Sequence, residues 1–548
     1  MKKFLFLAFF GRFVISCDAQ NFDWTVQYGD RWGRADEIGT DNTNAVYSIG
    51  TVFDTAFFES DTCPALRPGY VDARAYLVKH DPAGNIVWHR VMGGTAGGLG
   101  TSISVDPSGF FAASMRLDGD SINLGQDGTV YIGNSGGNSF LAKYDTFGNC
   151  IWYKRPQFYG NGGFGKVDLQ PDGSIVALGG FWDSVRFDGI LLSHTTDDVG
   201  NIFVVKYDNS GNILWADKAT STSASMYFPS GVTASSVSHD MDGNLYVVGN
   251  TYCDVWFDTS LVSFPIGSGY VAKYDASGNF LWVRNSPVHA EFKKIVCADN
   301  GYCIAAGGFD DPVIIGADTL SAAYHAGIIA KLDHEGNFLW GRQTLCAVPS
   351  YISDVALRDN KIYLCGSYRT TLALSSNPGI TITNNVRIAA FAGTMDTSGV
   401  ALWLASTAND SGDAGAYSIT ADAYGNAYFS GRMSGPIGFG DTVMGYDPPL
   451  EIFLSKIGSE ALTALAPQIN KDDLFMIYPN PSGGKYELNF LKCPDKMFIR
   501  IYDLNGAAIM TQYVSSPAYI DLSEFSNGIY FLEAGYGNKR KTRILVKD

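Results

Sequence analysis

The chain has 548 residues, a formal net charge of −16 and only 17% charged residues, whereas 14% of its residues are aromatic and 62 are glycine. Disordered chains are poorer in aromatic residues and richer in charge, and coiled coils do not tolerate so much glycine, so both classes are excluded. An acidic chain without a basic block repels phosphates, so we expect no nucleic-acid partner.

Residues 1–19 have the features of a secretory signal peptide. Two lysines follow Met1, residues 4–10 are apolar, and small residues suit cleavage after Ala19. The apolar segment is too short to span a bilayer, which needs roughly 20 residues, and we expect no transmembrane segment. A second interpretation stays open, because the residues up to Cys17 also resemble a bacterial lipobox, in which this cysteine is lipidated. Both interpretations take the protein out of the cytoplasm.

Two sequence elements recur between residues 21 and 458 with a period of about 63 residues. One is a strand ending in Lys-Tyr-Asp or a related triplet, followed by a glycine turn and a second strand that carries a Trp. The other combines a turn with an alternating apolar strand that ends in Gly. Both have the pattern of hairpins, and together they predict about four strands per repeat, as in a propeller blade. The repeated tryptophans are Trp24, Trp88, Trp152, Trp215, Trp282, Trp340 and Trp403.

The two ends of this array are out of phase. The array begins with only the second half of a repeat, at Trp24, whereas residues 451–458 have the pattern of the first half with no Trp after it. Joined, the two fragments complete a seventh repeat, which closes a ring and leaves no open sheet edge. We therefore predict an all-β protein in which residues 21–458 form a seven-bladed β-propeller closed between N- and C-terminal strands.

The repeat elements, such as FVVKYDNSGN (203–212) and DGNLYVVGN (242–250), resemble the bacterial β-propeller repeats called SBBP repeats. The resemblance implies the architecture but no activity, because members of that group are mostly of unassigned activity. The repeat is longer than a WD40 unit of about 40–45 residues. We expect the additional residues in loops such as 55–74, 118–138 and 255–268, where a binding function would lie.

Of the nine cysteines, eight follow Cys17, and none has the spacing of a metal-ligand pair, so we expect no metal and no other cofactor. Cys297 and Cys303 flank Asn300-Gly301, a hairpin turn signal that brings them close enough for a disulfide. The alternative is that both are small buried strand residues.

After residue 458 the repeat stops, residues 459–473 have the composition of a linker, and a new pattern occupies residues 474–548. Its motifs are Tyr478-Pro479-Asn480-Pro481, Ile501-Tyr502-Asp503 with Gly506, Asn527-Gly528-Ile529-Tyr530 and a basic ending. The pattern closely resembles the C-terminal type A sorting domain of proteins exported by the Bacteroidetes type IX secretion system. The resemblance implies a small β-sandwich that binds the outer-membrane translocon, and a sortase-like peptidase that removes it by cleavage in the linker. The alternative is a β-sandwich for adhesion or stability.

No pattern in the sequence identifies a catalytic residue. Neither HExxH nor GxSxG occurs, and no glycine-rich phosphate loop follows a strand. Single histidines beside the aspartate turns, such as His80 and His334, are expected to be solvated.

Repeated lysines and aspartates form the most regular charged pattern. The lysines are Lys79, Lys143, Lys206, Lys273, Lys331 and Lys456, and the aspartates two residues later are Asp81, Asp145, Asp208, Asp275 and Asp333. A functional interpretation makes the lysines an anion-attracting ring. We favour a structural interpretation, in which each lysine pairs with a nearby aspartate and the aspartate starts the turn, because a feature of every blade is expected to build the blade.

We therefore expect a secreted or cell-surface, non-catalytic propeller that binds or scaffolds a glycan or a protein. The seven repeated tryptophans are expected to pack between blades, whereas the unrepeated Trp32, Trp182 and Trp256 suggest stacking on sugar rings. Two alternatives stay open: an extracellular glycan hydrolase or lyase with loop-borne carboxylates, and a structural envelope or adhesion protein. Unrepeated carboxylates converging on the centre would favour the enzyme, an exposed aromatic platform the binding module, and a featureless face the structural protein.

Overall fold

The computed structural model describes residues 22–458 and 475–547 with gaps, and the chain divides into an N-terminal body, Met1–Leu462, and a C-terminal body, Thr463–Asp548. The gaps are residues 31, 54, 60, 65–72, 95, 96, 120, 125–128, 132–138, 195–198, 223–230, 266, 287–289, 385, 386, 409–411, 441, 446–450, 479–484, 491–495, 505, 516, 517, 537 and 538. The predicted signal peptide (1–19), with Cys17, and the linker (459–473) lie outside the described residues. Within the described residues the protein is all-β.

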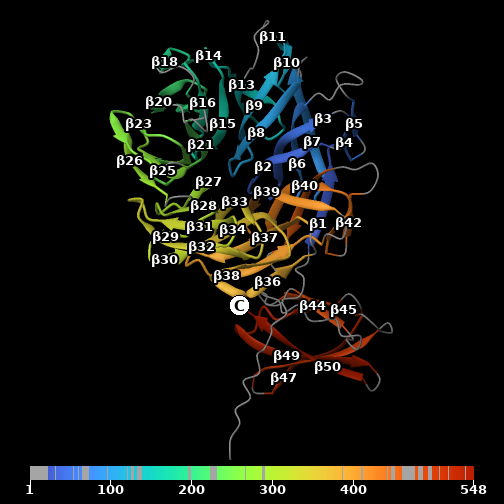
Figure 1. Cartoon of the computed structure of the whole chain (residues 1–548). Coiled ribbons are helices and arrows are strands. Elements are labelled where there is room, and N and C mark those ends of the chain that lie inside the picture. Colours follow the sequence, from blue (N-terminus) through green and yellow to red (C-terminus); the bar gives the residue numbers. More distant parts are fainter. Residues whose placement is uncertain are drawn as a thin grey trace, which may run out of the picture. The chain divides into compact units, whose positions relative to one another are not determined.

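Seven four-stranded antiparallel units, numbered I to VII, make up most of the described part of the N-terminal body (Figure 1). Unit I contains β2 (Arg34–Thr40), β3 (Val46–Phe53), β6 (Ala73–His80) and β7 (Ile86–Gly94); unit II contains β8 (Gly97–Val105), β9 (Phe111–Asp118), β12 (Ser139–Tyr144) and β13 (Cys150–Lys154). Unit III contains β15 (Gly162–Leu169), β16 (Ile175–Phe181), β19 (Asn201–Tyr207) and β20 (Ile213–Ser221); unit IV contains β21 (Val232–His239), β22 (Leu245–Thr251), β25 (Ser268–Tyr274) and β26 (Phe280–Asn285). Unit V contains β27 (Ala290–Cys297), β28 (Cys303–Phe309), β31 (Ala326–Leu332) and β32 (Phe338–Cys346); unit VI contains β33 (Tyr351–Arg358), β34 (Lys361–Tyr368), β37 (Ala389–Asp396) and β38 (Ala401–Ser406). Unit VII contains β39 (Asp413–Ala421), β40 (Ala427–Ser434), β43 (Ile452–Ile457) and β1 (Phe22–Tyr28).

Unit VII joins the two ends of the repeat array. β1 pairs antiparallel with β43, so that Trp24 lies opposite Lys456 and Tyr28 opposite Ile452. The first strands of successive units contact one another from β2 through β39, and β39 contacts β2 in turn. Between these last two strands, the Ile38 amide donates a hydrogen bond of 3.2 Å to Ser418 Oγ. The contacts between units therefore run in a closed cycle.

The position of a strand within its unit explains its sequence pattern. The second and third strands are almost entirely buried, as in β22 and β25, and most of their residues are apolar. Fourth strands alternate between exposed and partly buried residues, as in β13. Each unit thus packs its two middle strands between its neighbours.

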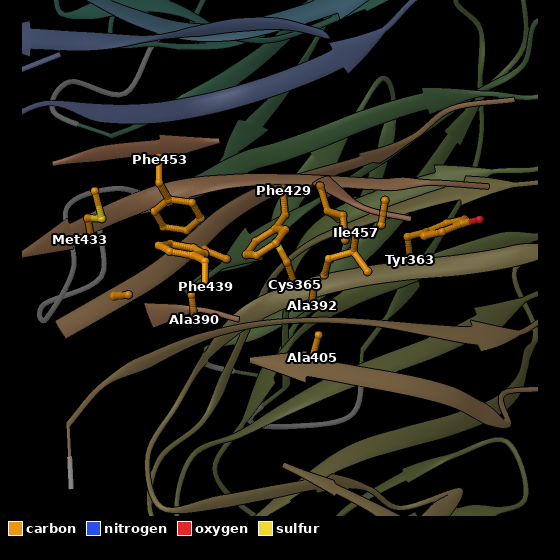
Figure 2. Packing of buried hydrophobic residues seen from close by; sticks show 14 of the residues in the cluster. Tyr363, Cys365, Ala390, Ala392, Ala405, Phe429, Met433, Phe439, Phe453 and Ile457 are labelled. Carbon is orange, nitrogen blue, oxygen red and sulfur yellow. The ribbon is translucent and has the colours of Figure 1, made fainter. Parts of the chain in front are cut away.

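One hydrophobic core lies between units VI and VII and is shown in Figure 2. The Phe453 ring packs against Phe429 and Phe439, with ring centroids 5.5 and 5.0 Å apart. Phe22 of β1 adds its ring 5.6 Å from Phe439. The N-terminal strand therefore completes a core built from the far end of the chain.

Hairpins occupy the connections between second and third strands, including the three loops in which the sequence predicted additional residues. They are β4–β5 (Ala56–Phe58, Asp61–Cys63), β10–β11 (Ser121–Asn123, Thr129–Tyr131), β17–β18 (Ser184–Phe187, Ile190–Ser193), β23–β24 (Val255–Phe257, Ser260–Val262), β29–β30 (Val313–Ile315, Asp318–Leu320), β35–β36 (Thr371–Leu374, Asn377–Thr383) and β41–β42 (Ile437–Phe439, Thr442–Met444). β10 pairs with β7, β23 with β20 and β35 with β32, so these hairpins extend the fourth strand of the preceding unit. β14 (Gln157–Phe158) pairs with β17.

The structure corrects the expectation for His80, which is fully buried rather than solvated. It occupies the position of the tyrosine in the Lys-Tyr-Asp triplet, where Tyr144, Tyr207 and Tyr274 are also buried. Its ring lies 5.3 Å from that of Tyr28, and burial lowers its pKa to about 3. The side chain therefore serves the core as a neutral ring.

Cys297 and Cys303 form a disulfide across the hairpin of β27 and β28, with Cα atoms 4.1 Å apart. Of the two interpretations of this pair, the bridged one is confirmed.

The described part of the C-terminal body consists of two antiparallel sheets that share one hydrophobic core. One sheet contains β44 (Phe475–Tyr478), β45 (Lys485–Phe490) and β48 (Ala518–Asp521); the other contains β47 (Ala508–Val514), β46 (Met497–Tyr502), β49 (Gly528–Tyr536) and β50 (Lys539–Lys547). Leu488 and Ile520 from the first sheet pack in the same core as Ile499 and Leu532 from the second.

Candidate functional site

Each first strand has a β-bulge at the same register, which creates two sets of seven equivalent positions. The bulge residues are Asp36, Thr101, Gly165, Ser235, Lys293, Ser353 and Tyr417. The residues directly after them, here called the inner ring, are Glu37, Ser102, Lys166, Ser236, Lys294, Asp354 and Ser418. Residue types at both sets differ from unit to unit, in contrast to the repeated lysines and tryptophans.

The charged members of the inner ring pair with one another across long distances in sequence. Lys294 Nζ donates a hydrogen bond of 2.6 Å to Glu37 Oε1 and lies 3.3 Å from Asp354 Oδ1. Lys166 Nζ lies 3.3 Å from Glu37 Oε2. Two carboxylates and two ammonium groups therefore neutralise each other.

Serine side chains connect these charges to neighbouring units. Ser102 Oγ donates a hydrogen bond to Glu37, and Ser418 Oγ donates one of 2.7 Å to Asp354 Oδ2. The Val167 amide donates to Ser102 Oγ over 3.2 Å. Since buried charges are stable only when paired and hydrogen-bonded, the serines complete the network that the lysines begin.

Electrostatics keeps the inner-ring carboxylate of Glu37 ionised. Burial alone would raise its pKa, but Lys166 and Lys294 outweigh burial and lower the pKa to about 2. The neighbouring bulge residue behaves differently, because burial raises the pKa of Asp36 to about 6 although Arg34 lies 3.0 Å away. Glu37 is therefore held as an anion within the network.

A pocket of about 680 Å³ lies at the junction of units VI and VII. Tyr351 at the start of β33 and the bulge residue Tyr417 line it, with 43% and 40% of their surfaces exposed. Ser367, Asp413, Arg432 and Ser434 also line it. The pocket thus combines two aromatic rings with several hydrogen-bonding groups, the composition of small-molecule sites.

Three charged residues line this pocket: Arg369, which is exposed, and Arg432 and Asp413, which are paired within the protein. Arg432 Nε donates a hydrogen bond of 2.6 Å to Glu451 Oε2. Asp413 Oδ1 accepts a hydrogen bond of 2.9 Å from the Ile388 amide, and Asp413 Oδ2 lies 3.8 Å from Arg387 Nη1.

The predicted repeat tryptophans lie on the fourth strands and contact the next unit. The indole Nε1 of Trp24 donates to the Pro82 carbonyl over 3.0 Å, and those of Trp88, Trp152, Trp215 and Trp340 donate to the carbonyls of Thr146, Asn209, Ala276 and Thr397 over 3.0–3.3 Å. Trp282 lies against Gly336 in the equivalent turn. All of these carbonyls belong to the turn between the third and fourth strands of the following unit. These tryptophans thus connect each unit to the next one by packing on its turn and, in five cases, by a hydrogen bond.

Trp403 is the exception. The described residues offer no hydrogen-bond partner to its buried Nε1. The following unit is VII, where β43 and β1 come from opposite ends of the chain, so the turn that would supply the carbonyl does not exist.

The repeated lysines and aspartates serve the turns. Asp81 Oδ1 accepts hydrogen bonds of 2.9 Å from the Ala83 and Asn85 amides, so the aspartate starts the turn. Lys79 Nζ lies 3.6 Å from Asp41 Oδ2, an aspartate of the other turn of the same unit. Lys273 lies 3.9 Å from Asp240 in the same way, whereas Lys143 and Lys331 donate to turn carbonyls. These contacts support the structural interpretation of both sets.

The predicted sorting residues lie partly within the described C-terminal body. Tyr478 ends β44 and Tyr502 ends β46, where the Tyr502 hydroxyl donates to Glu533 over 3.0 Å. Asp503 begins a turn in which Gly506 has a φ of +79°; Gly528 begins β49, and the Tyr530 hydroxyl donates to the Ser526 carbonyl over 2.5 Å. Pro479, Asn480 and Pro481 lie outside the described residues.

None of the three unrepeated tryptophans lines the pocket, although Trp32 and Trp256 are exposed. Sequence reasoning missed Tyr351 and Tyr417 instead. The available signal for Tyr417 was an aromatic residue at the bulge position, where the other first strands have small or polar residues. Within the described residues, no group of three or more His, Cys, Asp or Glu side chains is placed to hold a metal ion.

Residues 476–548 match the family model of the secretion system C-terminal sorting domain. This domain directs type IX secretion, and the protein is therefore exported to the cell surface or outside the cell. Among the described residues, no helix has the length and apolar character needed to cross a membrane.

Over 375 residues the chain is 24% identical to the uncharacterized WD repeat-containing protein L264 of Acanthamoeba polyphaga mimivirus, a match that covers 55% of this chain. The chain spans 27% of the length of that relative. Among solved structures, a protein of unknown function from Bacteroides caccae has a TM-score of 0.31 and 13% identity, covering 60% of this chain and 89% of its own. A mutant of the Synechocystis apocarotenoid oxygenase has a TM-score of 0.32 and 9% identity, covering 67% of this chain and 69% of its own. Both TM-scores lie below 0.5, and we infer no fold and no activity from either structure.

Proposed function

We propose that the N-terminal body is a seven-bladed β-propeller that acts as a non-catalytic binding or scaffold module outside the cell, for a glycan or a protein. Units I to VII would be the blades, and the cyclic contacts of their first strands support this assignment. The pairing of β1 with β43 supports closure of the ring through a shared blade. The Lys-Tyr-Asp hairpins favour SBBP-like repeats, and the match to a WD repeat-containing protein agrees with a propeller.

The inner ring favours binding over catalysis. Glycoside hydrolysis needs two carboxyl groups free to bind substrate and transfer protons. Glu37 and Asp354 converge at the first strands, but Lys294 and the serines use their oxygens. Two exposed aromatic residues, Tyr351 and Tyr417, line the pocket between units VI and VII, which supports a binding module.

The C-terminal body supplies the export signal in this proposal. Its partners would be the type IX translocon and a sortase-like peptidase that cleaves within residues 459–473. β43 ends at Ile457, so cleavage there would leave every strand of the repeat array intact.

An array of saccharides and proteins tests the binding function. It is probed with the chain that lacks only the predicted signal peptide, residues 1–19. Retention of a defined ligand without chemical change supports it, whereas shortening of a retained glycan would favour the hydrolase or lyase. Export is tested separately by removal of residues 474–548, which should leave the protein in the periplasm. Surface display of that truncated chain would contradict the role of the C-terminal body.

A further inference from the structure

We propose that the pocket between units VI and VII binds an uncharged saccharide, stacked on Tyr351 and Tyr417. This inference rests on the binding function proposed above and adds the site and the ligand class. The pocket volume of about 680 Å³ falls within the 300–1,000 Å³ typical of small-molecule sites.

The two tyrosines provide flat apolar surfaces for the C–H faces of sugar rings. Tyr417 is the bulge residue of β39, and bulges redirect side chains at functional sites. The His325 ring packs against Tyr351 with centroids 4.7 Å apart, which restricts the tyrosine before a ligand arrives. An aromatic side chain held in this way loses little conformational entropy on binding.

Of the three charged residues that line the pocket, Arg369 is exposed and stays hydrated when a ligand without charge binds, whereas Arg432 and Asp413 are already paired within the protein. Arg432 is held by the buried Glu451, and Asp413 is bound by the Ile388 amide with Arg387 nearby. An anionic ligand would compete with Glu451 for Arg432, and a cationic ligand would compete with Arg387 for Asp413. Hydroxyl groups impose neither cost, since they donate to the remaining lone pairs of Asp413 and accept from arginine N–H groups.

Polar and apolar residues both line the pocket, as a polyhydroxylated ring requires. Ser367 and Ser434 line it, together with the apolar residues Val348 and Pro349. A sugar presents C–H groups on its faces and hydroxyls at its edge, so a single ring can satisfy both kinds of surface. A purely apolar ligand would leave the serines, Asp413 and Arg432 desolvated without partners.

The experiment measures binding of the mature full-length chain to neutral oligosaccharides and to matched oligosaccharides containing uronic acids, by titration calorimetry. Tyr417→Ala and Tyr351→Ala should each weaken binding of the neutral ligand about tenfold, whereas Tyr417→Phe should retain it. Tyr424→Ala is the matched control, because Tyr424 is 73% exposed in the turn between β39 and β40 and does not line the pocket. Unfolding midpoints of all variants separate loss of binding from loss of folding.

Each of the following outcomes would overturn one part of the proposal. Neutral saccharides that bind equally to the wild type and to both alanine variants would move the site elsewhere and leave the binding function standing. Preferential binding of the uronic-acid series would refute the charge argument, and binding of a protein but no saccharide would refute the ligand class. If no saccharide and no protein binds, the proposed function itself fails.

Discussion

Trp215 of unit III lies directly against Gly278 in the turn between β25 and β26 of unit IV, the same turn whose Ala276 carbonyl accepts a hydrogen bond from its Nε1. Gly278 has a φ of +88°, and a Cβ atom built on it would lie 2.5 Å from Cδ2 of the indole. The turn glycine is therefore needed twice, for its backbone conformation and for the close approach of the tryptophan.

Gly278→Ala should lower the free energy of unfolding by more than the roughly 1–2 kcal/mol that a left-handed conformation costs an L-residue, because the contact with Trp215 must also open. Denaturant unfolding of the mature protein measures this change. Gly189→Ala is the control, since nothing lies within 4 Å of a Cβ at that position and its φ is not positive. If both substitutions lower the free energy of unfolding equally, the contact between Trp215 and Gly278 does not stabilise the protein.

Lys294→Gln should destabilise the protein by about 3–5 kcal/mol, because it leaves Glu37 and Asp354 without their shared counter-ion. The adjacent Lys293→Gln provides the control. Lys293 is an exposed bulge residue that pairs at the surface with Glu291, at 2.8 Å, and lies 6.0 Å from the centroid of the Tyr351 ring, so its loss should cost about 1 kcal/mol. A similar decrease in the free energy of unfolding of the two variants would contradict the buried network described for the inner ring.

The buried His80 predicts a pH dependence of stability. Its folded pKa of about 3 lies below the usual 6.5, so the unfolded chain binds more protons between these values and stability falls as the pH is lowered through this range. Between pH 6.5 and pH 5 the loss should be about 1.6 kcal/mol, because the slope is half of about 1.4 kcal/mol per pH unit at pH 6.5 and approaches that value at lower pH. Unfolding free energies of His80→Phe should lack this component.

His334→Phe is the control for that measurement, because His334 has an exposed side chain in the turn between β31 and β32. Its pH profile should match the wild type. If the unfolding free energy of His80→Phe depends on pH as that of the wild type does, other groups cause the pH dependence.

Removal of residues 22–28 should destabilise the N-terminal body strongly, because β43 loses its partner on one side and Phe22 leaves the core of unit VII. A synthetic peptide of residues 21–29 added in excess should raise the melting temperature of this truncated chain. Removal of residues 1–19 alone should leave the melting temperature unchanged. An unchanged melting temperature without β1 would contradict the shared unit.

The repeat architecture was predictable wherever residue identity recurs. The spacing of the tryptophans and the aspartate turns specified the hairpins, and the phase difference between Trp24 and Lys456 predicted that the ends meet. The inner ring was not predictable, because Glu37 and Lys294 come together only through the cyclic order of the units, and single charges in different repeats carry no pairing signal. His80 was misjudged because it was treated as a turn residue, although it fills the buried tyrosine position of its repeat.

The place of β43 within unit VII has a mechanical consequence. β43 is bonded to β40 on one side and to β1 on the other, so it is an inner strand although it ends the repeat array. Tension applied through the C-terminal side of the array enters this strand along its length and is resisted by two hydrogen-bond ladders at once. A terminal strand at a sheet edge would instead peel away from a single ladder. Pairing with β1 thus strengthens the attachment of β43, the strand at the other end of the repeat array, against this tension.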